Sequence, residues 1–133
     1  MNDYFQLQLH PEDVNRISML GLAHVGDGVY ELLVRSMLCA EGHQAIQDLH
    51  RETVRLVNAT AQSHAMEKIL PHLTDEETAI YRRGRNAKVH GIPPKSSVAE
   101  YHSATGLEAL FGWLYLLGRR ERLSELFAHI RED

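Results

Sequence analysis

The stretch that decides the fold is Leu20-Gly-Leu-Ala-His-Val-Gly-Asp-Gly-Val-Tyr-Glu-Leu-Leu-Val-Arg35. Its apolar residues recur every three or four positions, as at Leu22, Val25 and Val29, which predicts a helix with a buried face. Gly26-Asp27-Gly28 interrupts this pattern, because glycine weakens a helix interior and a buried carboxylate needs a partner. Asp27 is therefore either a metal ligand or one half of a salt bridge with an arginine.

A second acid lies in a similar setting near the C-terminus. Glu108 lies within an apolar helical pattern and is flanked by Gly106 and Gly112. If Asp27 and Glu108 face each other, they repel unless a proton or a cation lies between them. Carboxylate oxygens favour Mg²⁺, with Mn²⁺ as a substitute, over softer metals. Glu31 follows Asp27 by four positions on the same helix face and is a candidate third member of the site. The alternative is that each acid pairs separately with an arginine.

Basic residues are concentrated in a third stretch. No acid occurs between Arg82 and Ala99, although the net charge of the chain is −4. Such segregation indicates a site for a polyanion, because arginine binds phosphate through two parallel hydrogen bonds. The alternative is a solvated helix end, where cations favour the negative end of the helix dipole. The candidate residues for binding a polyanion are Arg82, Arg83, Arg85, Asn86 and Lys88, with His90 and Lys95 beyond them.

Length and composition indicate one globular domain over residues 1–133. The chain is 44% hydrophobic and 24% charged, and its single cysteine, Cys39, excludes an internal disulfide. We expect Cys39 to be a small core residue. Neither a signal-peptide pattern nor an apolar run of membrane-spanning length is visible, so we expect a cytoplasmic protein with no membrane partner.

The fold class predicted from periodicity is all-α. We expect about five helices, over residues 11–40, 44–72, 74–88, 96–117 and 119–130. Thr74 and Glu77 have the spacing of a capping box at one helix start, and Gly42 and Gly118 are expected helix stops. Pro93-Pro94 predicts a loop.

Three stretches, in this order, resemble a known family. Residues 22–31 resemble the signature helix of the ribonuclease III catalytic domain, and residues 105–112 resemble the second acidic motif of that superfamily. Together with Arg-Arg-Gly-Arg-Asn-Ala-Lys at 82–88, they are similar to Mini-ribonuclease III, a bacterial branch with no double-stranded-RNA-binding domain. The resemblance extends from about Leu20 to Leu126.

This resemblance implies a helical, homodimeric and Mg²⁺-dependent endonuclease of double-stranded RNA. It implies maturation of 23S ribosomal RNA and products with 5′-phosphate and 3′-hydroxyl ends, and a ribosomal protein is a candidate partner that presents the RNA. Asp27 matches the signature aspartate and Glu108 the essential glutamate, so both are the expected catalytic residues and metal ligands. Glu31 is expected to orient water, and Thr105 to bond Glu108 or a metal-bound water. Acids of full-length ribonuclease III are replaced at Leu20, Ala23 and Thr105, as they are in the Mini branch.

Two other functional classes compete with this interpretation. A catalytically silent helical dimer that holds structured RNA during ribosome assembly needs the basic stretch but not both acids. A metal-binding bundle built from the nine histidines is disfavoured, because no two of them are three or four residues apart.

Overall fold

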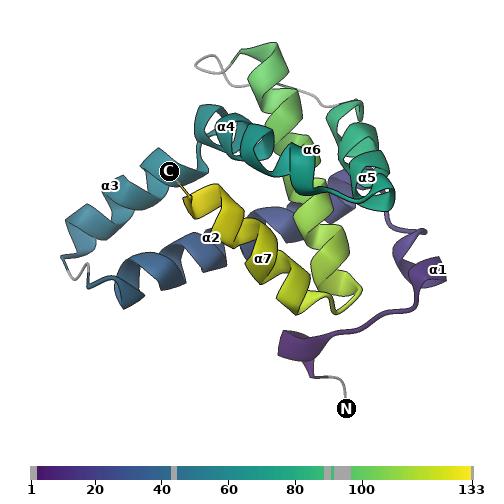
Figure 1. Cartoon of the computed structure of the whole chain (residues 1–133), viewed down its shortest axis with the longest axis horizontal. Coiled ribbons are helices and arrows are strands. Elements are labelled where there is room, and N and C mark those ends of the chain that lie inside the picture. The colour runs from purple at the N-terminus through teal and green to yellow at the C-terminus, as the bar shows by residue number, and fades with distance from the viewer. Residues whose placement is uncertain (1–2, 43–44, 89–90, 92–96, 133) are drawn as a thin grey trace.

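The computed structural model describes residues 3–42, 45–88, 91 and 97–132. These residues form seven α-helices and two short 3₁₀ turns, η1 (Tyr4–Gln6) and η2 (Leu70–His72), without a strand (Figure 1). The helices are α1 (Pro11–Val14), α2 (Met19–Ala40), α3 (Ile46–Val57), α4 (Ala59–Ile69), α5 (Asp75–Arg85), α6 (Val98–Leu116) and α7 (Arg120–Arg131).

The all-α prediction is confirmed, but the expected number of about five helices is wrong. Each of the first two expected helices is divided in two. Residues 15–18 are not helical, and they separate α1 from α2. Ser18 caps the start of α2, because its side chain accepts a hydrogen bond from the Gly21 N–H at 3.0 Å. Asn58 divides α3 from α4, because its Oδ1 accepts from Ala61 N while its Nδ2 donates to the Val54 carbonyl.

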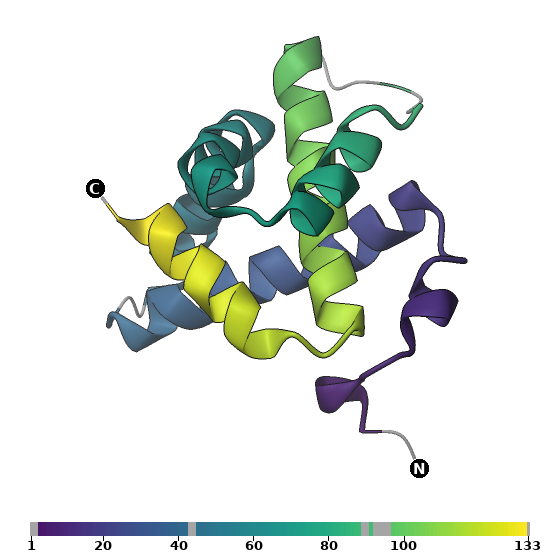
Figure 2. The same cartoon turned by 45° about the vertical axis from the view of Figure 1, so that its right-hand side comes forward.

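Helix α6 is the centre of the molecule. Helices α2, α4, α5 and α7 all contact it, and Figure 2 shows α2 crossing it. Its residues Leu107, Leu110, Phe111 and Leu114 have no exposed surface. A helix buried on several sides places any polar group that it carries close to its neighbours, so the partly buried Glu108 lies near side chains of α2 and α4. None of the described helices is both long enough and apolar enough to cross a membrane.

Several local predictions are confirmed. Thr74 and Glu77 form the expected capping box at the start of α5, and Gly42 and Gly118 have the positive φ angles, 97° and 79°, that favour glycine after a helix. The prediction for Cys39 is wrong, because its side chain is exposed near the C-terminal end of α2. Pro93-Pro94, His90 and Lys95 lie outside the described residues.

Candidate active site

The crossing of α2 and α6 is unusually close, and two glycines make it possible. A Cβ atom at Gly26 would lie 1.6 Å from the Glu108 carbonyl oxygen. A Cβ atom at Gly112 would lie 2.0 Å from the Leu22 carbonyl oxygen. Because side chains are absent at both positions, the two backbones touch. This contact fixes the segment that carries Asp27 against the turn that carries Glu108.

Asp27 and Glu108 form a carboxyl pair beside this crossing. Asp27 is exposed and Glu108 is partly buried, and their side chains are joined by a hydrogen bond. Burial raises the pKa of Glu108 to about 8, with further contributions from the hydrogen bond to Asp27 and from the Asp27 charge. Among the described residues, neither acid takes part in a salt bridge with an arginine or lysine. The structure thus brings together the two acids that the sequence singles out, and neither forms the alternative salt bridge with any arginine or lysine in the described ranges.

Gln62 is the polar residue of this site that sequence analysis missed. Its side chain reaches the Glu108 carboxyl from α4 and favours the charged form of Glu108, which opposes the rise in the pKa of that group. Gln62 is only 3% exposed. Its Nε2 atom is fully enclosed and completes no hydrogen bond of normal geometry within the described part of the chain. A buried amide donor of this kind is suited to hold a carboxylate in one orientation.

The two supporting residues expected from the sequence have other partners in this structure. The Glu31 carboxylate lies 3.5 Å from Arg35 Nη2. The Thr105 hydroxyl donates to the Tyr101 carbonyl at 3.0 Å, one helical turn back, and not to Glu108. Contact of either residue with a metal-bound water therefore stays a prediction.

The donor set of the site fits a hard divalent cation with an incomplete protein shell. No group of three or more His, Cys, Asp or Glu side chains in the described ranges could hold a metal ion. The two adjacent carboxyls supply oxygen ligands of the type that Mg²⁺ prefers. Mg²⁺ commonly keeps several waters and completes its shell with substrate phosphate, so two protein ligands are sufficient.

The basic stretch lies at the C-terminal end of α5, and a second pair of glycines places that helix against α6. A Cβ atom at Gly84 would lie 2.7 Å from the Ala109 Cβ atom, and one at Gly106 would lie 2.7 Å from the Tyr81 ring. The basic end of α5 is therefore held against the helix that carries Glu108. The side chains of Arg82, Arg83 and Lys88 are exposed and form no ion pair within the described residues. Arg85 lies over the Tyr81 ring, and Asn86 is exposed.

Comparison with known proteins assigns this arrangement to a family. The ribonuclease III domain family matches residues 20–119, which include both acids and the basic stretch. The chain is 50% identical to Mini-ribonuclease 3 of Symbiobacterium thermophilum over 107 residues, which cover 80% of this chain and 82% of that protein. The chain belongs to the Mini-ribonuclease 3 family. It is also 44% identical to Mini-ribonuclease 3 of Thermoanaerobacter sp., over 89% of this chain and 83% of the relative.

A solved structure supports the same assignment at the level of the fold. A protein of Fusobacterium nucleatum, determined by X-ray crystallography, superposes with a TM-score of 0.82 and is 32% identical. The match covers 91% of this chain and 98% of the other. As a member of the Mini-ribonuclease 3 family, the chain is an endoribonuclease of the ribonuclease III type. Proteins of the ribonuclease III family act on double-stranded RNA and generally depend on a divalent metal ion.

Proposed function

We propose that residues 1–133 form one endonuclease domain that cleaves double-stranded RNA with Mg²⁺ held by Asp27 and Glu108. The observation that carries this proposal is the hydrogen-bonded carboxyl pair at the α2–α6 crossing. When bound there, Mg²⁺, or Mn²⁺ in its place, would supply Lewis-acid stabilisation of the phosphate and an activated water. We expect the products to carry 5′-phosphate and 3′-hydroxyl ends.

The role of the chain itself is to present two carboxylates in a fixed position. Glu108 must release its proton before it acts as a ligand. Of the two acids, Asp27 is exposed at the surface and Glu108 is partly buried. Gln62 approaches Glu108 from α4 and supports the charged form once the proton has left. Because Gly26 and Gly112 allow backbone contact, neither acid depends on a flexible loop for its position.

The basic end of α5 is the proposed RNA-binding surface. Duplex RNA is recognised mostly through its shape, its phosphates and its 2′-hydroxyls. Arg82, Arg83, Arg85 and Lys88 are suited to bind phosphates, and Asn86 to bind a phosphate or a 2′-hydroxyl. The close packing of Gly84 on α6 connects this surface to Glu108 through one rigid helix pair.

A homodimer is proposed through the outer face of α2. This face borders an apolar groove of about 480 Å³ beside Asp27, lined by Val25, Val29 and Leu32 among others. Leu32 is 58% exposed, and Phe5, which also lines the groove, is 82% exposed. A second copy would cover these side chains and would place two active sites on one duplex, one for each strand.

The biological setting follows from the family resemblance alone. We propose a cytoplasmic role in ribosome biogenesis, in which the substrate is the 23S ribosomal RNA precursor and a ribosomal protein presents it. The second candidate function is a catalytically silent dimer that binds structured RNA.

One experiment separates these candidates. A perfect RNA duplex and a single-stranded RNA of the same sequence are incubated with the protein, each in Mg²⁺ and in EDTA. We expect cleavage of the duplex only, and in Mg²⁺ only, with 5′-phosphate ends on the fragments. Binding of the duplex without cleavage would support the silent dimer, and cleavage of single strands alone would overturn the assignment.

A further inference from the structure

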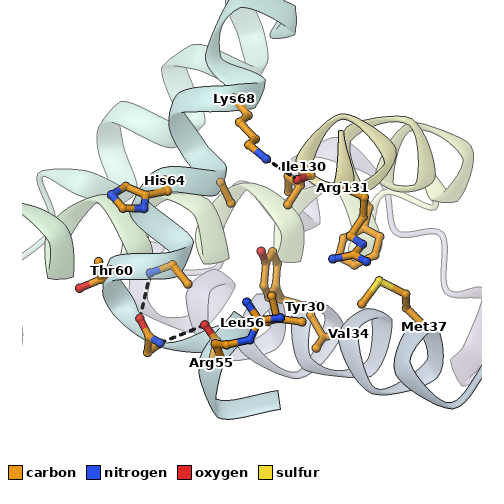
Figure 3. Close-up of a pocket in the computed structure, with 14 residues that line it drawn as sticks. Tyr30, Val34, Met37, Arg55, Leu56, Thr60, His64, Lys68, Ile130 and Arg131 are labelled. Carbon is orange, nitrogen blue, oxygen red and sulfur yellow. Dashed lines mark hydrogen bonds between the residues drawn. The ribbon is translucent and has the colours of Figure 1, made fainter. Parts of the chain in front are cut away.

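A second cavity lies between α2, α3, α4 and α7. Its volume is about 390 Å³, within the range of small-molecule sites. Its lining differs from that of the apolar groove, because three cationic side chains, Arg55, Lys68 and Arg131, come from three different helices. Figure 3 shows that these side chains and the Tyr30 hydroxyl border one space. None of the described residues that line the cavity is acidic.

Tyr30 provides a buried polar group at the base of this cavity. The side chain is only 2% exposed, yet its hydroxyl makes no hydrogen bond within the part of the chain that the structure describes. In Figure 3 the hydroxyl points into the space bordered by α4 and α7. Burial raises the pKa of Tyr30 to about 12, so the hydroxyl remains a hydrogen-bond donor at neutral pH. A donor that faces the cavity and has no acceptor among the described residues is available to a ligand oxygen.

The three cations keep hydrogen-bond donors for a ligand. Arg55 binds Glu52 through Nε and Nη2, and Arg131 binds Glu41 through Nη2; both acids lie outside the cavity lining. Lys68 Nζ donates to the Ile130 and Glu132 carbonyls. These bonds orient the cationic groups at the rim of the cavity, and N–H groups of each have no partner among the described residues.

The N-terminus of α4 adds to the positive potential. Asn58, Thr60 and Ala61, at the start of this helix, line the cavity. The Thr60 backbone N–H makes no hydrogen bond among the described residues. The first N–H groups of a helix and its dipole favour phosphate.

The remaining walls are apolar, which restricts the kind of anion that fits. Val34, Met37, Phe127 and Ile130 line the side formed by α2 and α7. Inorganic phosphate would satisfy the cations but would leave this surface uncovered. A flat, partly apolar group attached to the phosphate would cover it, and an aromatic base beside Phe127 has the required shape.

From these contacts we propose that the cavity between α2, α3, α4 and α7 binds a free nucleoside phosphate. Arg55, Lys68, Arg131 and the Tyr30 hydroxyl bind the phosphate, and the base lies on the wall formed by Met37, Phe127 and Ile130. The site is separate from Asp27 and Glu108, neither of which lines it. The proposal does not depend on the metal or on cleavage.

The test is calorimetric titration of the intact protein with AMP, adenosine and inorganic phosphate in EDTA. Arg55→Gln and Arg16→Gln form a matched pair, since each arginine is exposed and pairs with an acid three residues earlier, and only Arg55 lines the cavity. Tyr30→Phe removes the hydroxyl and retains the ring that contacts Phe111 and Phe127.

We expect AMP to bind in the micromolar to millimolar range and at least tenfold more tightly than adenosine or inorganic phosphate. Arg55→Gln and Tyr30→Phe should each weaken AMP binding by about tenfold, while Arg16→Gln should not change it, and all three variants should cleave duplex RNA normally. No binding of AMP at millimolar concentration, or equal binding by Arg55→Gln and Arg16→Gln, would overturn the proposal. Loss of duplex binding in Arg55→Gln would also overturn it, because the cavity would then belong to the RNA surface.

Discussion

Replacing Gly26 by alanine should destabilise the protein severely, whereas the same change at Gly28 should not. The new Cβ atom at position 26 would lie 1.6 Å from the Glu108 carbonyl oxygen and 2.8 Å from the Gly112 nitrogen. Ordinary contacts of a Cβ atom begin near 3.4 Å, so α2 and α6 would have to separate by about 2 Å. Both clashing atoms belong to the backbone, and no side-chain rotation relieves the overlap. Overpacking that moves helices costs on the order of 3 kcal/mol or more.

Gly28 provides the matched control on the same helix, two residues later. No atom lies within 4 Å of a Cβ atom built at this position. Gly28→Ala should therefore raise stability by up to about 1 kcal/mol, through helix propensity alone. Urea unfolding of both variants in EDTA, followed by circular dichroism, measures the two free energies. Equal changes in stability at positions 26 and 28 would refute the backbone contact that positions the carboxyl pair.

Glu108→Gln should raise the stability of the metal-free protein at pH 8 by up to about 4 kcal/mol, and the two proteins should converge toward pH 4.5. The folded state raises the pKa of Glu108 from 4.5 to about 8, so the wild-type protein loses stability as the pH rises from 4.5 to 8. A wild-type stability that does not change over this pH range would contradict the prediction. Arg83→Gln should lower the salt-dependence slope of duplex binding by about 1 in a titration at several salt concentrations, and an unchanged slope would exclude a phosphate contact. Leu32→Asp should shift the protein to monomer in analytical ultracentrifugation, whereas Leu20→Asp, on the same helix outside the groove, should not; equal behaviour of the two would exclude that face as the interface.

The sequence was sufficient for the helices whose ends have strong local signals. Thr74 and Glu77 are chemically paired in a capping box, and Gly118 is needed for a positive φ angle, so both ends were predicted. The division at Asn58 was missed, because an asparagine within a run of helix formers differs little from any other polar residue until its side chain caps the next helix. Cys39 was wrongly predicted to be buried, because the helical sequence pattern of α2 continues beyond the part of the helix that packs on the core.

The two acids of the site were predictable, but their surroundings were not. Asp27 and Glu108 are conspicuous because each interrupts an apolar helix. The flanking glycines looked equivalent in sequence. In the structure, the neighbouring backbone occupies the place of a side chain at Gly26, whereas the place of a side chain at Gly28 is open. Gln62 carries no charge and occupies a helix without any unusual spacing, so only the packing of α4 on α6 shows its contact with Glu108.

The most direct test of the central claim is Mn²⁺ binding by the two acids, measured by electron paramagnetic resonance at pH 8. Wild type, Asp27→Asn, Glu108→Gln and the double variant are compared, with Asp13→Asn as a control because Asp13 is an exposed aspartate on α1. We predict that each single variant loses Mn²⁺ binding and duplex cleavage together, that the double variant is no worse, and that Asp13→Asn behaves as wild type. Undiminished Mn²⁺ binding and cleavage in either single variant would contradict the account.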